Sequence, residues 1–141
     1  GGGVILDLGC YTTSMSLLAV SLIDNLDITN FKFIDIQTDY LYSDIDVHSF
    51  AKINFDNKFV SNVTVSFKDD IGKKTIILCE NGKIILDKTL NFENFKNIYS
   101  IEIENISKDI IDNKTEASFP GINKKEILLN SKLIDNWINE K

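Results

Sequence analysis

Arginine is absent from this chain of 141 residues, and all 15 of its basic side chains are lysines. The 21 acidic residues outnumber them, which leaves a formal net charge of −6 at neutral pH. Proteins that bind nucleic acids usually present a basic face on which arginines contact phosphates and bases. A chain that is acidic and has no arginine is therefore not expected to bind nucleic acid.

Long hydrophobic runs are also missing. The strictly apolar runs are only a few residues long, and 15–23, which includes two serines, is far shorter than the roughly 20 residues needed to span a membrane. No basic segment precedes it, as a signal peptide would require. We therefore expect no membrane partner.

Metal-binding and disulfide patterns are scarce. The two cysteines, Cys10 and Cys79, lie far apart and show no Cys-x-x-Cys spacing, so no zinc site is expected. They are typical of reduced thiols in a cytoplasmic protein, and we interpret Cys10 as a small packing residue. Asp44, Asp46 and His48, the only histidine, alternate along a predicted strand and would share one face, a conceivable metal site. A solvated strand edge is the favoured interpretation, so no metal ligands are assigned. His48 as a catalytic base is an equally conceivable alternative and is likewise not favoured.

Glycine patterns that bind nucleotides are absent as well. The sequence contains no G-x-G-x-x-G, no P-loop and no G-x-S-x-G. The glycines at 1–3 lead into a hydrophobic segment and do not follow a strand. We therefore expect this chain to bind no cofactor by itself. Because the chain opens on three glycines and not on methionine, we interpret it as a piece of a longer protein.

The sequence does contain the composition and periodicity of one globular domain over residues 1–141, with 43% hydrophobic and 26% charged residues. Helical spacing predicts a buried helix over 12–23, and Tyr99, Ile103, Ile106 and Ile110 predict a second. Period-two alternation predicts five strands between them, at 31–42, 47–55, 59–67, 74–79 and 84–87. A slip is expected near Phe33–Ile34, a tight turn at Asp56-Asn57-Lys58, and a type I′ hairpin turn at Asn81-Gly82.

A third helix is expected near the end of the chain. Asn123 stands three residues before Glu126, as in a capping box, and an apolar face follows it: Ile127, Leu129, Leu133, Ile134, Trp137 and Ile138. The order helix, antiparallel strands, two helices predicts an α+β fold, in which helices pack on one face of an open antiparallel sheet.

The other face of such a sheet must meet water or a partner. We expect it to carry Phe50, Val60, Ile77 and Ile85 among polar neighbours. Several apolar side chains on an open face are consistent with a homodimer interface, and equally with hydrophobic side chains that are merely scattered over the surface.

The most distinctive local feature is the opening segment. Asp7 and Tyr11 are four residues apart around a glycine, and they project to one side if this turn is helical. A tyrosine can donate a proton to a carbonyl or alkoxide when a nearby cation lowers its pKa, although no such cation is evident here. On the residues alone, an N-terminal helix cap at Asp7 and a core tyrosine at Tyr11 remain the stronger interpretation.

The segment Gly1–Tyr11 resembles the G-G-G-x-L-x-D-x-G-x-Y/H motif of the Gfo/Idh/MocA family of NAD(P)-dependent oxidoreductases. Similar patterns follow along nearly the whole chain, although only the opening motif is specific: 46–67, 76–85, and Phe119-Pro120-Gly121 with the last helix. Tyrosine at the last motif position is similar to the branch that includes glucose–fructose oxidoreductase and trans-dihydrodiol dehydrogenase.

The resemblance implies a fold like the C-terminal domain of glyceraldehyde-3-phosphate dehydrogenase and a missing N-terminal Rossmann domain, which would bind NAD or NADP. It implies Tyr11 as proton donor and acceptor, and Asp7 as the residue that positions substrate hydroxyls. The whole enzyme would be a dehydrogenase acting on a hydroxyl or carbonyl of a sugar, cyclitol or diol, and this piece alone would be inactive. The alternative is a non-catalytic antiparallel-sheet module for dimerisation or ligand binding.

Overall fold

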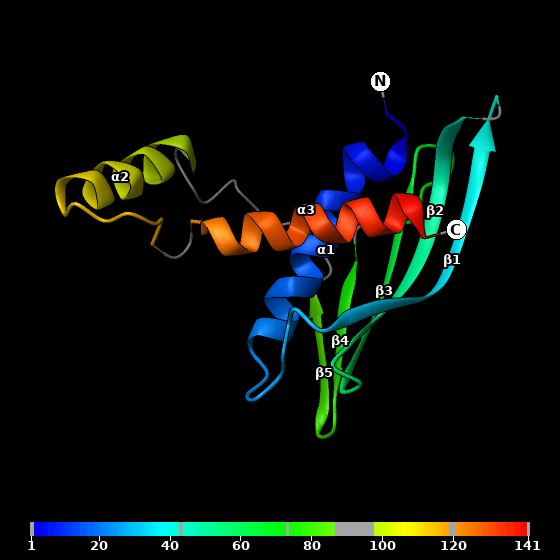
Figure 1. Ribbon diagram of the computed structural model, residues 1–141, viewed down its shortest axis with the longest axis horizontal. Helices are drawn as coiled ribbons and strands as arrows, with labels where there is room; N and C mark the ends of the chain where they lie inside the picture. Colours follow the sequence, from blue (N-terminus) through cyan, green and yellow to red (C-terminus); the bar gives the residue numbers. More distant parts are fainter. Residues whose placement is uncertain (1, 43, 73, 87–97, 119–120, 141) are drawn as a thin grey trace. The chain divides into compact units, whose positions relative to one another are not determined.

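The computed structural model describes residues 2–42, 44–72, 74–86, 98–118 and 121–140. The chain has an α+β fold whose elements follow the expected order (Figure 1). They are α1 (Val4–Ser21), β1 (Phe31–Leu41), β2 (Ile45–Phe55), β3 (Phe59–Ser66), β4 (Thr75–Cys79), β5 (Gly82–Leu86), α2 (Ile98–Ile111) and α3 (Lys124–Asn139). The chain divides into a first unit, 1–71 with 128–141, and a second unit, 72–127. A single domain over 1–141 stays a prediction.

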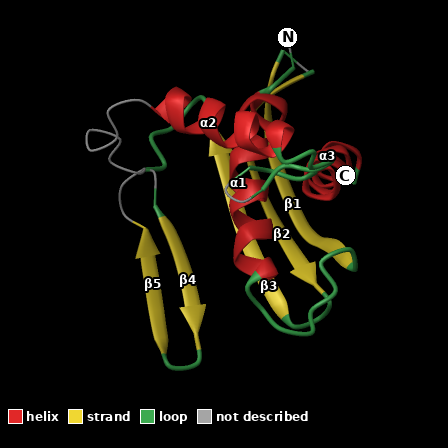
Figure 2. Ribbon diagram, turned by 90° about the vertical axis from the view of Figure 1, so that its left-hand side faces the viewer, coloured by secondary structure: helices red, strands yellow, loops and turns green. Residues whose placement is uncertain are grey.

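The first unit is built on an antiparallel sheet of order β1-β2-β3, with α1 running along it (Figure 2). The turn between β2 and β3 places Asp56 and Asn57 at φ of 51° and 55°, a region that Asn and Asp tolerate better than most residues. The register of β1 shifts between Phe33 and Asp35, which confirms the predicted slip.

The core of the first unit lies between the sheet and two helices. Alternate residues of β2 and β3 point toward α1 and toward the buried side of α3. The strands contribute every second residue to this core, and the helices contribute residues three or four apart. The fully buried side chains include Val4, Val20, Ile53, Phe55, Leu133 and Trp137. Both helices therefore cover one face of this sheet, as predicted.

Helix α1 begins at Val4, eight residues before the predicted start. Gly9 lies inside this helix and is buried. A β carbon on Gly9 would lie 2.9 Å from Cδ1 of Ile134, so the glycine lets α3 approach closely. A glycine inside a helix costs about 1 kcal/mol relative to alanine, and here it leaves the room that Ile134 occupies.

The 18 residues of α1 have a mean hydropathy of 1.4, which makes it, by length and composition, a candidate membrane span among the described residues. Core helices of soluble proteins have the same composition. In this structure Val4, Ile5, Leu17 and Val20 of α1 belong to the core that covers β2 and β3. The length and composition of α1 are therefore only weak evidence for a membrane span.

Helix α3 starts with the predicted capping box. The Asn123 amide donates to the Glu126 carboxylate at 3.0 Å, and the Glu126 amide donates to the Asn123 side chain at 2.9 Å. Farther along, Leu129, Leu133 and Trp137 are buried at intervals of four residues, so one stripe of the helix faces the sheet.

The second unit contains the β4–β5 hairpin and helix α2. Cys79 pairs with Gly82, so the hairpin loop is Glu80-Asn81. The predicted type I′ turn at Asn81-Gly82 is wrong, because positive φ falls on Gly82 and not on Asn81. In α2, the Asp109 carboxylate accepts hydrogen bonds from the Ser118 amide and the Lys114 ammonium group.

The apolar set expected on one open face is divided between two sheets. Phe50 and Val60 lie on the open face of β1-β2-β3, where most neighbours are polar, such as Lys52 and Asn62. In the hairpin, Ile77 pairs with Ile84 and Ile85 pairs with Ile76. Because side chains alternate between faces, Ile77 and Ile85 lie on opposite faces of the hairpin. A shared face for all four residues is therefore wrong.

Candidate functional site

Asp7 and Tyr11 lie on successive turns of α1, on the side turned away from the sheet. Both residues are exposed, and Tyr11 retains 72% of its accessible surface. Residues four apart on a helix are surface neighbours, so a phenol and a carboxylate stand side by side on one ridge. Among the described residues, the Tyr11 hydroxyl makes no hydrogen bond, which leaves it available to a ligand.

The structural interpretation of these two residues is wrong. The N-cap position of α1 is held by Gly3, and Asp7 lies one turn further on, where its charge is favourable to the helix dipole. Tyr11 is not a core residue, because the buried face of α1 is formed by other positions, such as Gly9, Thr13 and Ser16. Asp7 therefore has a favourable place at the helix start, whereas neither packing nor capping accounts for Tyr11.

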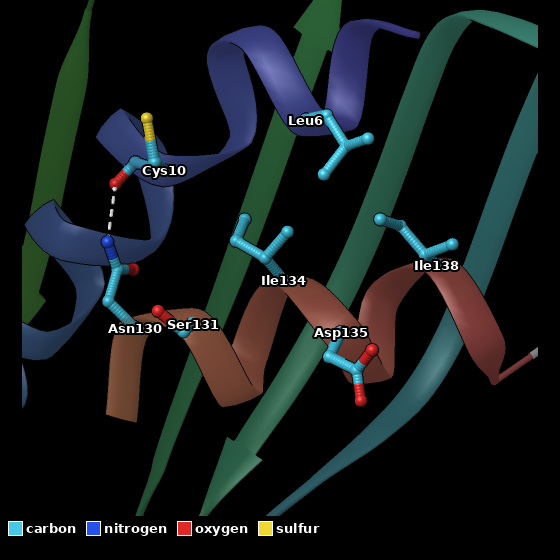
Figure 3. Close-up of a pocket in the computed structure, with 7 residues that line it drawn as sticks. All are labelled: Leu6, Cys10, Asn130, Ser131, Ile134, Asp135 and Ile138. Atoms are coloured by element: carbon cyan, nitrogen blue, oxygen red, sulfur yellow. Dashed lines mark hydrogen bonds between the residues drawn. The ribbon is translucent and has the colours of Figure 1, made fainter. Parts of the chain in front are cut away.

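A shallow pocket of about 350 Å³ flanks this ridge, between α1 and α3. Figure 3 shows Leu6 of α1 facing Ile134 and Ile138 of α3, and these three side chains form the apolar part of the pocket lining. Its polar margin consists of Cys10, Asn130, Ser131 and Asp135. Asp7 and Tyr11 do not line it, so the pocket adjoins the candidate site without containing it.

Asn130 joins the two helices beside this pocket. Its side-chain amide donates to the Cys10 carbonyl oxygen at 3.3 Å, the bond drawn in Figure 3. The same amide donates to the Ser14 hydroxyl at 2.9 Å, and the side-chain oxygen accepts from the Thr13 hydroxyl at 2.5 Å. These contacts fix the orientation of α1 against α3. Sequence reasoning missed Asn130, because an asparagine in a helix gives no signal of its partner.

The first turn of α1, which follows Gly2 and Gly3, already holds an acidic group of the chain itself. The amide of Ile5, in the first turn of α1, donates to Oδ2 of Asp46 at 2.7 Å. Helix N-termini bind phosphates through such amides, but here a carboxylate of the chain itself already occupies the position. The Ile5 amide is therefore not free to bind a phosphate.

Asp46 and His48 do not share a strand face, contrary to the sequence-based expectation. Asp46 contacts α1, whereas His48 Nδ1 lies 3.2 Å from the Asp69 carboxylate. Asp44 is exposed in the turn before β2. Among the described residues, no group of three or more His, Cys, Asp or Glu side chains is arranged to hold a metal ion.

The two cysteines are both free thiols. Cys10 is half-buried at the margin of the pocket, and Cys79 is exposed at the end of β4. The position of Cys10 is consistent with a packing residue, as expected.

Comparison of the chain with protein-family models, with curated proteins and with solved structures finds no match.

Proposed function

We propose that this chain is the substrate-side domain of an NAD(P)-dependent oxidoreductase similar to the Gfo/Idh/MocA family. The observation that carries the proposal is the exposed pair Asp7 and Tyr11 on the outer side of α1, within the motif that resembles this family. A phenol and a carboxylate that are neighbours on one helix surface can both contact the same bound molecule. The proposed substrate is a sugar, cyclitol or diol.

In this proposal Tyr11 gives or takes the proton at the reacting oxygen of the substrate. The carboxylate of Asp7, one helical turn away, accepts hydrogen bonds from neighbouring hydroxyl groups and so sets the orientation of the substrate.

The nucleotide cofactor, NAD or NADP, must be held by another domain. No residue of this chain forms a dinucleotide fingerprint, and the first turn of α1 is already occupied by Asp46. The outer side of α1 offers a surface for contact with that cofactor-binding domain, because Tyr11, Leu18 and Leu22 recur there at helical spacing and are all exposed. Two free thiols support a cytoplasmic location.

The test measures oxidation of a panel of sugars, cyclitols and diols by the whole protein that carries this chain, with NAD and NADP. Tyr11→Phe should lower kcat by about 10²–10⁴-fold, because the proton donor is lost. Tyr42→Phe is the matched control, since Tyr42 is also exposed but lies in the turn after β1.

This chain alone should show no turnover with either cofactor. Turnover by the isolated chain, or full activity in Tyr11→Phe, would contradict the proposal.

The second candidate is a non-catalytic module for dimerisation or ligand binding. It is favoured by the β4–β5 hairpin, which carries exposed isoleucines on both faces. An isolated two-stranded hairpin is marginal in water, so such a surface calls for a partner. Absence of turnover in the whole protein, together with self-association of this chain, would favour the module.

A further inference from the structure

The carboxylate of Asp46 caps a helix that lies 41 residues earlier in the sequence. Its Oδ2 accepts a hydrogen bond from the Ile5 amide at 2.7 Å, in the first turn of α1. The N-cap residue itself, Gly3, has no side chain that can do this. An ionised acceptor makes a stronger bond than a neutral one, and negative charge is favourable at a helix N-terminus.

Gly3 provides the space that Asp46 needs. Its backbone, with φ −75° and ψ −163°, is extended and open to any residue, so conformation does not require glycine here. A β carbon on Gly3 would collide with the Asp46 carboxylate and would lie 2.6 Å from the Asp46 carbonyl oxygen. The third glycine of the opening motif and Asp46 are therefore sterically matched.

A β-bulge in β2 aims Asp46 at the helix. Asp39 pairs with His48 and the next residue, Tyr40, pairs with Asp46, so Val47 is an extra residue on β2. An extra residue interrupts the alternation of side chains between the two faces of a sheet. Asp46 thus reaches α1, while His48 contacts Asp69.

We propose that Asp46 is a positioning residue for the site formed by Asp7 and Tyr11. It fixes the first turn of α1, and with it Asp7 about one turn and Tyr11 about two turns further along the same rigid helix. This role rests on the proposed function, whereas the capping contact and its match to Gly3 do not.

The capping contact is tested by amide hydrogen exchange and NMR on Asp46→Ala, Asp46→Asn and the control Asp44→Ala. Asp44 is exposed two residues away and has the same chemistry. Asp46→Ala should speed exchange of the Ile5 amide about tenfold and shift the Tyr11 resonances. Asp46→Asn, whose side-chain oxygen still accepts, should retain most of the protection, and Asp44→Ala all of it. An Ile5 amide unchanged in Asp46→Ala would overturn the proposal.

The match with Gly3 is tested by a double-mutant cycle in urea unfolding. Gly3→Ala should destabilise the protein more when Asp46 is present than in the Asp46→Gly background, where the colliding carboxylate is gone. Asp46→Gly removes the carboxylate but leaves the carbonyl oxygen of residue 46 only 2.6 Å from the added β carbon, so partial recovery of stability in the double variant is the expected result. Strictly additive effects of the two substitutions would overturn the match between Gly3 and the Asp46 carboxylate.

The positioning role is tested in the whole protein by turnover. Asp46→Ala should lower kcat more than it changes KM, and Asp46→Asn should restore most of kcat. Equal kcat in all variants, with the Ile5 result as expected, would refute positioning but keep the cap. Loss of the proposed function itself is recognised separately, because Tyr11→Phe would then leave turnover unchanged.

Discussion

Trp137 illustrates how single buried polar groups define this structure. Its indole N–H donates to the Ser49 hydroxyl at 2.9 Å, and Ser49 lies 2.8 Å from the Thr38 hydroxyl. Trp137 and Ser49 are at most 1% exposed, so water cannot replace these bonds. Ser49→Ala should lower the free energy of unfolding by about 1–3 kcal/mol, because the indole N–H stays buried without a partner.

The measurement is urea unfolding of Ser49→Ala beside Ser21→Ala. Ser21 is exposed in the last turn of α1 and bonds only to the carbonyl oxygen of Leu18. Its substitution should stay within about 0.5 kcal/mol of wild type. Equal effects of the two substitutions would show that the buried hydrogen bond contributes nothing.

Asp109 gives the clearest pH dependence of any described residue. Hydrogen bonds from the Ser118 amide, the Lys114 ammonium group and the Ser118 hydroxyl lower the pKa of Asp109 from 3.8 to about 2. Since the folded pKa is the lower one, the stabilisation is complete above the unfolded value of 3.8 and is lost as pH falls through about 2. The Ser118 amide resonance, followed by NMR through this range, should therefore titrate near pH 2.

Asp109→Asn is the control for this titration. It removes the titrating group, so the Ser118 amide should show no transition in this range. A transition that persists in Asp109→Asn would assign it to another carboxyl group.

At the scale of elements, helix α3 depends on the capping box that the sequence predicts. Asn123 and Glu126 satisfy one another's backbone amides, which the helix itself leaves without partners. Asn123→Ala should destabilise the protein by about 0.5–2 kcal/mol, and Asn123→Ser should recover most of the loss. Thermal unfolding followed by circular dichroism measures both. A serine variant as unstable as the alanine variant would mean that the side-chain cap is not the cause.

At the scale of the whole molecule, we expect a homodimer. Light scattering coupled to size exclusion should give twice the chain mass of 16.0 kDa. Val60→Lys tests the open face of the three-stranded sheet, where Val60 is 46% exposed, and Ile77→Lys tests the hairpin. Leu22→Lys on the outer side of α1 is the control.

Loss of the dimer in one of the two test variants would place the interface on that sheet. Charges at an apolar interface oppose association because they must be desolvated. A monomeric wild-type chain would contradict self-association through either sheet.

The order and type of the elements could be predicted from the sequence, because periodicity reflects local geometry that each segment carries. The sequence also predicted the slip in β1 and the capping box of α3, since each involves residues at most four positions apart. The start of α1 depends on contacts distant in sequence, because the space at Gly9 is filled by Ile134 of α3. The tertiary structure likewise decided the role of Asp46, because a bulge and a partner 41 residues away leave no local pattern.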